Sequence, residues 1–324
     1  MAGVDGGDGG AIGQRAADGG PRMADGWRRA AGGEEVGRGA AARRDTIGTV
    51  PELPEVDFVR RMLAPVMTGV RVDGVLLRRA ALRIPFPPDF EARLVGHTIT
   101  AVTRRAKYLL ASLSTGETLI VHLGMSGWFR VERAAGPEFD AEPGHTDDDP
   151  AHDHVVFRMA SGHLVTFNDP RRFGLMDLAS RDALHQHPAI RDLGPEPLSP
   201  AFDAAALARA CHRRRTPIKV ALLDQAVVAG VGNIYASEAC FEARISPRRK
   251  AATIATSTGA PRPQARALAA AVVKVLERAI ATPTARFKVY ERAGAACPRR
   301  GCAGTIRRIV QGGRSTFYCP ACQR

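Results

Sequence analysis

The sequence predicts an α+β protein in which an antiparallel β-sandwich precedes a helical domain and a small cysteine-rich module. Short β-branched or apolar segments follow one another between residues 70 and 167, separated by turn residues and without helical patterns between them. Amphipathic helical patterns then occupy residues 203–280, and two cysteine pairs lie close to the end of the chain. Strands followed by helices are typical of an α+β protein rather than an alternating α/β one.

The composition is that of a globular protein with a strong positive charge. Of the 324 residues, 45% are hydrophobic and 24% charged, enough to form two domain cores. No apolar run approaches the roughly 18 to 20 residues of a membrane span, and no segment has the pattern of a secretory signal. We therefore expect a cytoplasmic protein. The net charge of +13 suits a polyanion, either nucleic acid or an anionic membrane surface.

Residues 1–49 differ from the rest of the chain. They hold 14 of the 33 glycines and one aromatic residue, Trp27, without a sustained period of 2 or 3.6. Such a segment cannot bury enough apolar surface to offset the conformational entropy lost on folding. We expect a disordered or non-native extension. Its seven arginines balance its seven acidic residues, so the excess positive charge lies on residues 50–324.

Residues 51–180 are expected to form the sandwich domain. A helical pattern over 55–66 opens it, and an acidic stretch over 133–153 interrupts the strands; a solvated surface loop explains these acids better than a metal site. The expected strands are Val70–Leu77, Thr98–Val102, Tyr108–Leu113, Thr118–Leu123, Gly127–Val131, His154–Met159 and His163–Phe167.

The proline-rich segment 192–200 (DLGPEPLSP) predicts a connection between domains, within a linker over 181–200. A helical domain is expected over 201–290. Its expected helices are Asp203–His212, Pro217–Gln225, Ile234–Phe241 and Gln264–Ile280.

The module over 291–324 contains Cys297-x4-Cys302 and Cys319-x2-Cys322. Four thiolates at this spacing favour a zinc ribbon, because so small a module cannot fold on core burial alone. Two disulfides are the alternative, but nothing in the sequence indicates export. The remaining cysteines, Cys211 and Cys240, are expected to be buried and without a chemical role.

Three loops have residue types that suit nucleic-acid binding, each with a plainer alternative. Gly230–Tyr235 places glycines before a helix, so its amides could bind phosphate, although a helix–turn–helix corner explains the pattern equally well. Asp169–Gly174 joins two arginines to Phe173, either as a salt-bridged turn or as a wedge that replaces an extruded base. His122–Gly127 exposes Met125 at a glycine turn, as core filler or as a second wedge.

The sequence resembles the bacterial formamidopyrimidine-DNA glycosylase and endonuclease VIII family, and specifically its formamidopyrimidine branch. The resemblance extends over residues 51–324 and rests on strings that occur in family order. They are PELPEV (51–56), RRAKYLL (104–110), HLGMSG (122–127), DPRRFG (169–174), LGPEPL (193–198), TPIK (216–219), GVGNIYASE (230–238) and STFYCPAC (315–322).

The resemblance implies a β-sandwich, a helix-two-turn-helix domain and a zinc finger with one structural Zn²⁺ held by Cys297, Cys302, Cys319 and Cys322. It further implies a monomeric bacterial enzyme of the cytoplasm, associated with the nucleoid. Such an enzyme removes formamidopyrimidine or 8-oxoguanine from damaged double-stranded DNA and cleaves the strand by β,δ-elimination.

By the same resemblance, Pro51 is the nucleophile that attacks C1′, and Glu52 is the acid that assists base departure. Lys107 matches the lysine of β-elimination, and Arg314 the finger arginine of δ-elimination and phosphate binding. The implied DNA-binding residues are Met125, Arg171 and Phe173, which fill the gap left by the base, together with His152, Arg214, Lys219 and Asn233. Glu238 also lies in a family motif.

Two features depart from the family. Pro51 is preceded by Val50, and a proline nitrogen inside a chain is an amide that cannot attack. We expect that the valine codon is the initiator and that residues 1–49 are not native; a tail removed by proteolysis and a silent paralogue are the alternatives.

The second departure is the segment ATPTARFKVYERAGAA between Ile280 and Cys297. It is short for the formamidopyrimidine branch, where it includes a lid over the extruded purine. A short lid favours a preference for oxidised pyrimidines, as in endonuclease VIII. The string PELPEV and the residues Met125, Arg171 and Phe173 instead favour a preference for purine lesions. A non-catalytic binder of damaged DNA is the alternative from another class.

Overall fold

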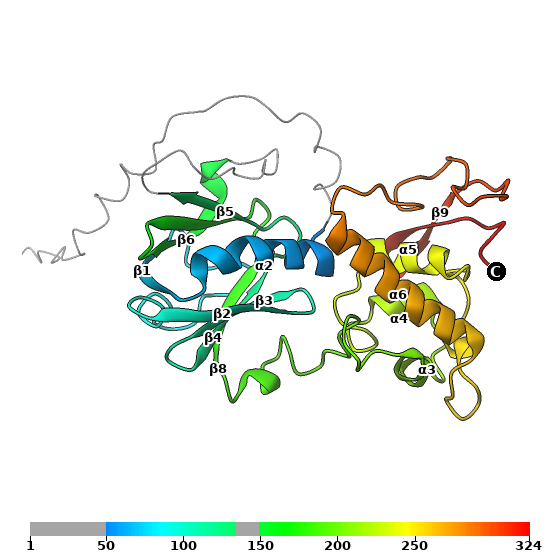
Figure 1. Cartoon of the computed structure of the whole chain (residues 1–324), viewed down its shortest axis with the longest axis horizontal. Coiled ribbons are helices and arrows are strands. Elements are labelled where there is room, and N and C mark those ends of the chain that lie inside the picture. The colour runs from blue at the N-terminus through cyan, green and yellow to red at the C-terminus, as the bar shows by residue number, and fades with distance from the viewer. Residues whose placement is uncertain (1–49, 134–148) are drawn as a thin grey trace, which may run out of the picture. The chain divides into compact units, whose positions relative to one another are not determined.

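The computed structural model describes residues 50–133 and 149–324 (Figure 1). The N-terminal extension and most of the predicted acidic loop lie outside these residues, so both remain expectations. The α+β class is confirmed. The helices are α2 (Leu53–Met67), α3 (Ala204–Cys211), α4 (Ile218–Leu223), α5 (Asn233–Glu242) and α6 (Pro263–Ala281), with 3₁₀ turns η1 (Pro150–His152), η2 (Leu184–Gln186) and η3 (Ala251–Ile254).

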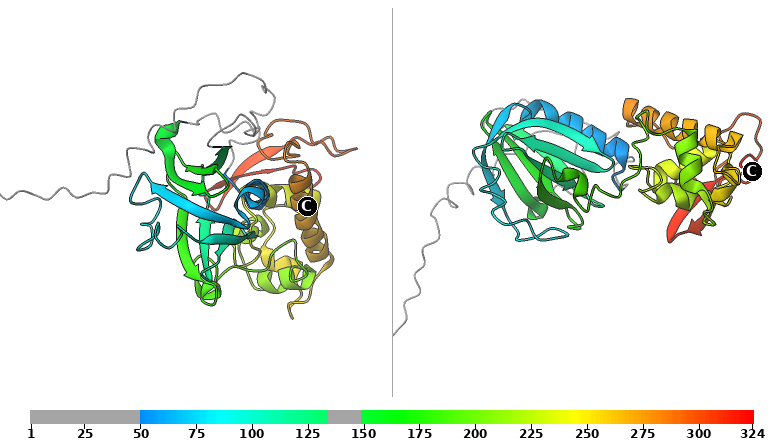
Figure 2. Two further views of the ribbon diagram at one scale, coloured as in Figure 1. Left: turned by 60° about the vertical axis from the view of Figure 1, so that its left-hand side comes forward. Right: turned by 90° about the horizontal axis from the view of Figure 1, so that it is seen from below.

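The N-terminal domain is an antiparallel sandwich in which β1 belongs to both layers. The strand order is β5-β7-β6-β1-β2-β3-β4-β8, and β1 pairs with β2 through its first two residues and with β6 through the rest. Figure 2 shows the two layers. The strands are β1 (Val70–Leu77), β2 (Thr98–Arg105), β3 (Tyr108–Leu113), β4 (Glu117–His122), β5 (Trp128–Arg133), β6 (Asp153–Met159), β7 (His163–Asn168) and β8 (Leu175–Ser180).

One strand, β8, has no counterpart among the predicted strands. It lies at the edge of the sheet, where it pairs only with β4, and polar residues such as Asp177 interrupt its apolar pattern. An edge strand needs one partner and little burial, so its sequence carries a weak signal. It extends the layer that carries β3 and β4.

Helix α2 packs on the sandwich through residues at helical spacing. Val56, Val59, Leu63 and Val66 are all buried and join the core formed by the inner faces of the strands. At the start of the helix, the Glu55 carboxylate accepts a hydrogen bond from the Glu52 amide at 3.0 Å. The first turn of the helix is therefore stabilised by a hydrogen bond between two of its own acidic residues.

The first residue of α2 belongs to a different core. Leu53 is fully buried in the cluster formed by α3–α6, and its amide donates to the Gly230 carbonyl at 3.2 Å. Gly230 has a φ of +84°, and a Cβ there would lie 2.6 Å from Leu53 Cδ1. The sandwich and the helical domain therefore share α2.

The C-terminal module is built on a two-stranded hairpin, β9 (Arg307–Gln311) and β10 (Arg314–Tyr318). Its small apolar cluster includes Phe241 of α5, so the module packs on the helical domain. Among the helices of the described residues, none combines the length and the apolar character needed to cross a bilayer.

Replacing Leu53 with alanine should lower the free energy of unfolding by about 2–5 kcal/mol, because the substitution leaves a cavity where α2 enters the helical core. Chemical denaturation measures the loss. Leu198→Ala is the matched control, since Leu198 is 37% exposed and its truncation should change stability by no more than about 0.5 kcal/mol. Equal stabilities of the two variants would contradict the shared core.

Candidate active site and DNA-binding surface

The N-terminus of α5 holds the carboxylate of Glu52. Glu52 is 2% exposed and accepts hydrogen bonds from the amides of Gly232 at 2.8 Å, Ile234 at 2.9 Å and Tyr235 at 3.4 Å. These are amides that an α-helix leaves without intrahelical partners, and the helix dipole adds positive potential there. From the sequence, the amides at the start of this helix were a candidate phosphate-binding site. In the structure they bind the Glu52 carboxylate, which comes from the other domain. Pro51, also buried, directly precedes Glu52.

Lys107 approaches the same point from the turn between β2 and β3. A Cβ built on Gly232 would lie 2.5 Å from Glu52 Oε1 and 2.7 Å from Lys107 Nζ. Only a residue without a side chain fits between the carboxylate, the amine and the helix. The structure therefore places Lys107 beside Glu52, which follows Pro51 in the chain.

Burial shifts these groups toward their neutral forms. It raises the pKa of Glu52, which the charge of Lys107 and the helix amides oppose, and it lowers the pKa of Lys107, which Glu52 and Glu55 oppose. Burial also raises the pKa of Glu55, whose carboxylate accepts a hydrogen bond from the Tyr235 hydroxyl at 2.7 Å. An acid with a raised pKa beside an amine with a lowered one is an arrangement that suits proton transfer.

A buried polar chain links α4 and α5 to the cysteine module. Lys219 is fully buried and donates to Asn233 Oδ1, while Asn233 Nδ2 donates to the Ser315 carbonyl at 3.0 Å. Burial and, to a smaller extent, the charge of Arg314 lower the pKa of Lys219 to about 8, while the charge of Glu52 opposes this shift. Arg314 is exposed at the start of β10, and its charge also lowers the pKa of Lys107. This cationic group therefore borders the Glu52 site.

The sequence did not single out His122, which ends β4 directly opposite Tyr108. Its Nδ1 accepts a hydrogen bond from the Gly124 amide at 2.9 Å, and its ring lies 4.9 Å from that of Tyr108. Burial, with the charges of Lys107 and Arg83, lowers the His122 pKa to about 4. At neutral pH the ring is therefore neutral with its hydrogen on Nε2, a donor beside Lys107. The only sequence signal was its place in HLGMSG.

The two predicted wedge loops form one unit. Asp169 is fully buried; its carboxylate accepts from the Ser126 hydroxyl at 2.6 Å and from the Gly174 amide at 2.8 Å. The Arg171 amide donates to Ser126 Oγ at 3.2 Å. The loop of Met125 is therefore bound to the loop of Arg171 and Phe173.

The side chains of this unit face outward to different degrees. Phe173 is 43% exposed, with the Arg171 guanidinium 4.9 Å from its ring centre, and Met125 is partly buried. An exposed aromatic ring beside a cation is the arrangement expected of a wedge.

Of the other two implied DNA contacts, His152 borders this unit, because its carbonyl accepts a hydrogen bond from the Asp169 amide at 3.0 Å, whereas Arg214 lies in the helical domain. His152 is partly exposed in η1, and the Arg78 side chain donates to the carbonyl of Pro150 in that turn at 3.0 Å. Arg214 is engaged inside the helical domain, with Nη1 2.6 Å from Asp224 Oδ2 and Nε donating to the Ala210 carbonyl. Its neighbours Arg213 and Arg215 are exposed.

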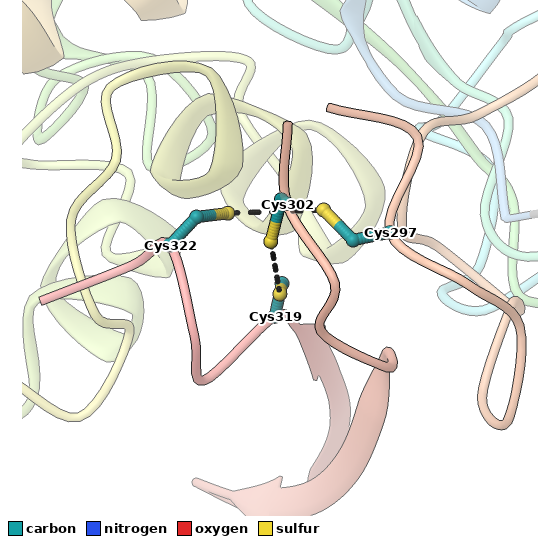
Figure 3. Close-up of side chains that lie close together, drawn as sticks. All are labelled: Cys297, Cys302, Cys319 and Cys322. Carbon is teal, nitrogen blue, oxygen red and sulfur yellow. Dashed lines mark hydrogen bonds between the residues drawn. The ribbon is translucent and has the colours of Figure 1, made fainter. Parts of the chain in front are cut away.

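The four cysteines of the C-terminal module converge (Figure 3). Their sulfur atoms all lie within 4.8 Å of one another, with Cys297 Sγ 3.8 Å from Cys322 Sγ and Cys302 Sγ 3.7 Å from Cys319 Sγ. These separations exceed a disulfide bond and suit four thiolates around one tetrahedral ion, so the donor set fits zinc. Cys211 and Cys240 are buried elsewhere, and burial raises their thiol pKa values to about 11 and about 12.

Three family profiles cover the described chain in order. The formamidopyrimidine-DNA glycosylase N-terminal domain matches residues 50–176, the helix-two-turn-helix domain of the same enzymes matches 193–290, and the zinc finger found in FPG and IleRS matches 294–324. The chain belongs to the formamidopyrimidine-DNA glycosylase family.

Relatives in sequence and structure agree with this assignment. Formamidopyrimidine-DNA glycosylases of Rhodopseudomonas palustris strain BisA53 and Bradyrhizobium sp. strain ORS 278 are 51% and 50% identical, over 85% of this chain and 100% of each relative. The Lactococcus lactis glycosylase, solved with DNA containing an AP site, superposes with a TM-score of 0.72 at 28% identity, over 85% of this chain and 100% of that one. The Thermus thermophilus protein gives 0.69 at 36% identity, over 84% and 98%.

Gly304→Ala should weaken zinc binding by about 10- to 100-fold, the effect of disturbing the shell around a metal site. A Cβ on Gly304 would lie 2.6 Å from Cys319 Sγ and 3.3 Å from Cys302 Sγ. Val310→Ala is the control, because Val310 lies in the same module and is 65% exposed. Competition with a chromophoric chelator measures both affinities; unchanged zinc binding in Gly304→Ala would disprove the assigned geometry.

His122 should make stability fall at acid pH. Its pKa is about 4 in the folded protein and about 6.5 in the unfolded chain, so the unfolded state binds the proton first as the pH falls. Between pH 7 and 4.5 this one group should remove about 2–3 kcal/mol of unfolding free energy. His122→Asn, which keeps an acceptor for the Gly124 amide, should show a smaller loss by urea denaturation. Parallel pH profiles would show that His122 titrates normally.

Proposed function

We propose that this protein is a DNA glycosylase and AP lyase that removes oxidised or ring-opened purines from double-stranded DNA. The observation that carries the proposal is the convergence of Glu52 and Lys107 at Gly232, next to Pro51. The solved relatives support the substrate class, because they are described as bound to DNA with an AP site, a benzylated formamidopyrimidine or carbocyclic 8-oxoguanine.

The reaction begins with nucleophilic attack. A free Pro51 nitrogen attacks C1′ of the damaged nucleotide, the glycosidic bond breaks, and the base leaves with a proton. Glu52, whose pKa is raised by burial, is the acid that assists opening of the sugar and departure of the base. The product is an iminium ion between proline and deoxyribose.

The iminium then acts as an electron sink. It acidifies the C2′ proton, which the amine of Lys107 removes as the base, and the 3′ phosphate leaves in β-elimination. Arg314, beside Lys107, binds the phosphate and supports the second elimination. No step uses the zinc ion, which stabilises the finger that carries Arg314.

The extruded base leaves a gap that the wedge unit fills. Flipping a nucleotide costs a few kcal/mol, and insertion of Met125, Arg171 and Phe173 offsets part of that cost. His152, Arg214, Lys219 and Asn233 complete the proposed DNA-binding set. Lys219 acts by holding Asn233 and the finger.

The mechanism requires that Pro51 be the first residue of the active protein. We propose that residues 1–49 are absent from it and that the codon of Val50 is read as an initiator Met, which is then removed; the start of the family match at residue 50 supports this. Intact-mass analysis of protein purified from its native host tests this directly. An active protein that retains residues 1–49 would disprove it.

Protein that starts at Pro51 should form a covalent adduct with lesion-containing DNA under borohydride, because reduction fixes the Schiff base. Protein that retains residues 1–49 should form none, and Pro51→Gly should trap poorly. Gel electrophoresis quantifies the covalent adduct, and peptide mapping identifies the residue that carries the sugar. A sugar attached to another residue would overturn the nucleophile, and the absence of any adduct would favour a non-catalytic binder of damaged DNA.

An endonuclease VIII-like preference for oxidised pyrimidines is the second candidate. The observation that favours it is the short connection between α6, which ends at Ala281, and Cys297. The Lactococcus lactis enzyme has also been solved with DNA containing an oxidised pyrimidine. Excision rates on duplexes with 8-oxoguanine, formamidopyrimidine or thymine glycol separate the two, since the proposal requires the purine lesions to be removed faster.

A further inference from the structure

The turn that carries Lys107 has an unfavourable backbone conformation. Strand β2 ends at Arg105 and β3 begins at Tyr108, so only Ala106 and Lys107 connect them. Ala106 has a φ of +53°, a left-handed conformation that residues with a Cβ seldom adopt. Neighbouring groups must hold such a residue in place.

Glu196 supplies those contacts from a distant part of the chain. Its carboxylate accepts a hydrogen bond from the Ala106 amide, and it pairs with Arg104 Nη1 at 2.9 Å and Arg105 Nη1 at 3.0 Å. The three charged side chains are only 11–25% exposed. Charge-assisted hydrogen bonds in such surroundings are stronger than exposed ion pairs.

The segment around Glu196 is fixed to both domains. Arg105 Nη2 donates to the carbonyls of Leu193 and Gly194, at 3.0 and 2.6 Å. On the other side, the Gly194 amide donates to the Gln225 carbonyl at 2.8 Å and the Ala229 amide to the Pro195 carbonyl at 3.0 Å.

The hydrogen bonds of Gly194 and Pro195 to Gln225 and Ala229 connect this segment to the Glu52 site. The Gln225 side chain accepts from the Gly230 amide at 2.9 Å and donates to the Val231 carbonyl at 2.8 Å. Gly232 and α5 follow, with the amides that hold Glu52. Residues 193–198 therefore contact both the turn that places Lys107 and the turn that places Glu52.

We infer that Glu196 is a positioning residue for the lyase step. It fixes the Ala106–Lys107 turn against the α5 N-terminus, so that the Lys107 amine lies beside Glu52. The connection between the domains thereby sets catalytic geometry as well as joining the domains. This inference rests on the proposed function, because Lys107 must be the group that performs the elimination.

Glu196→Ala should slow cleavage of DNA that already contains an abasic site by about 10- to 100-fold in kcat, with little change in KM, because a displacement of about 1 Å costs this much. Glu196→Gln keeps an acceptor for the Ala106 amide and should recover part of the rate. Glu117→Ala is the matched control, since Glu117 is 23% exposed and pairs with Arg93 elsewhere in the sandwich. It should retain the wild-type rate.

A double-mutant cycle distinguishes positioning from general destabilisation. In a Lys107→Ala background, Glu196→Ala should cause no further loss, because Glu196 acts through Lys107. Equal losses in both backgrounds, or a rate for Glu196→Ala no lower than for Glu117→Ala, would overturn the inference. If Lys107→Ala itself leaves strand cleavage intact, the assigned role of Lys107 fails instead.

Amide hydrogen exchange of the full chain gives a readout that does not depend on activity. The peptide covering Arg104–Tyr108 should exchange faster in Glu196→Ala than in wild type or Glu117→Ala, because the Ala106 amide loses its acceptor. Unchanged exchange of that peptide would show that Glu196 does not hold the turn.

Discussion

The architecture of the site depends on the bond between the Glu52 carboxylate and the first amides of α5. This bond joins residues about 180 positions apart in the chain and lies where a helix offers unpaired donors to an anion. Because the carboxylate is buried, these donors replace the water it has lost. The sandwich supplies the acid and the helical domain supplies its environment, so neither contains the site alone.

The same bond determines the electrostatics around it. The Glu52 carboxylate occupies amides that could otherwise bind a phosphate, and the charges of Lys107 and Arg314 act on the same region. Burial disfavours the charged forms of Glu52 and Lys107, while the charge of each group stabilises the charged form of the other. Small changes in their separation therefore shift both protonation equilibria. A Cβ on Gly232 would force such a change, because it would lie 2.5 Å from Glu52 Oε1 and 2.7 Å from Lys107 Nζ.

Local patterns in the sequence were sufficient for most of the fold, and less so for the site. The bounds of β1 and β3 were predicted to the residue, and the zinc module followed from cysteine spacing, because both are properties of neighbouring residues. The partner of the α5 amides could not be predicted, since it comes from the other domain, about 180 residues earlier in the chain. The lowered pKa of His122 likewise depends on burial and on the charges of Lys107 and Arg83 from other segments, which no local pattern encodes.

The connection after α6 is held at its end by α5. The Glu238 carboxylate accepts hydrogen bonds from the amides of Lys288, Val289 and Tyr290 at 2.8–3.0 Å, so the end of this segment is firmly held. Phe287 packs edge-on between Tyr235 and Tyr290. Tyr235 in turn donates to Glu55, whose carboxylate accepts from the Glu52 amide. The end of this connection is therefore tied to the groups that support Glu52, and under the proposed function a change in its length should alter which base is held rather than how the bond is broken.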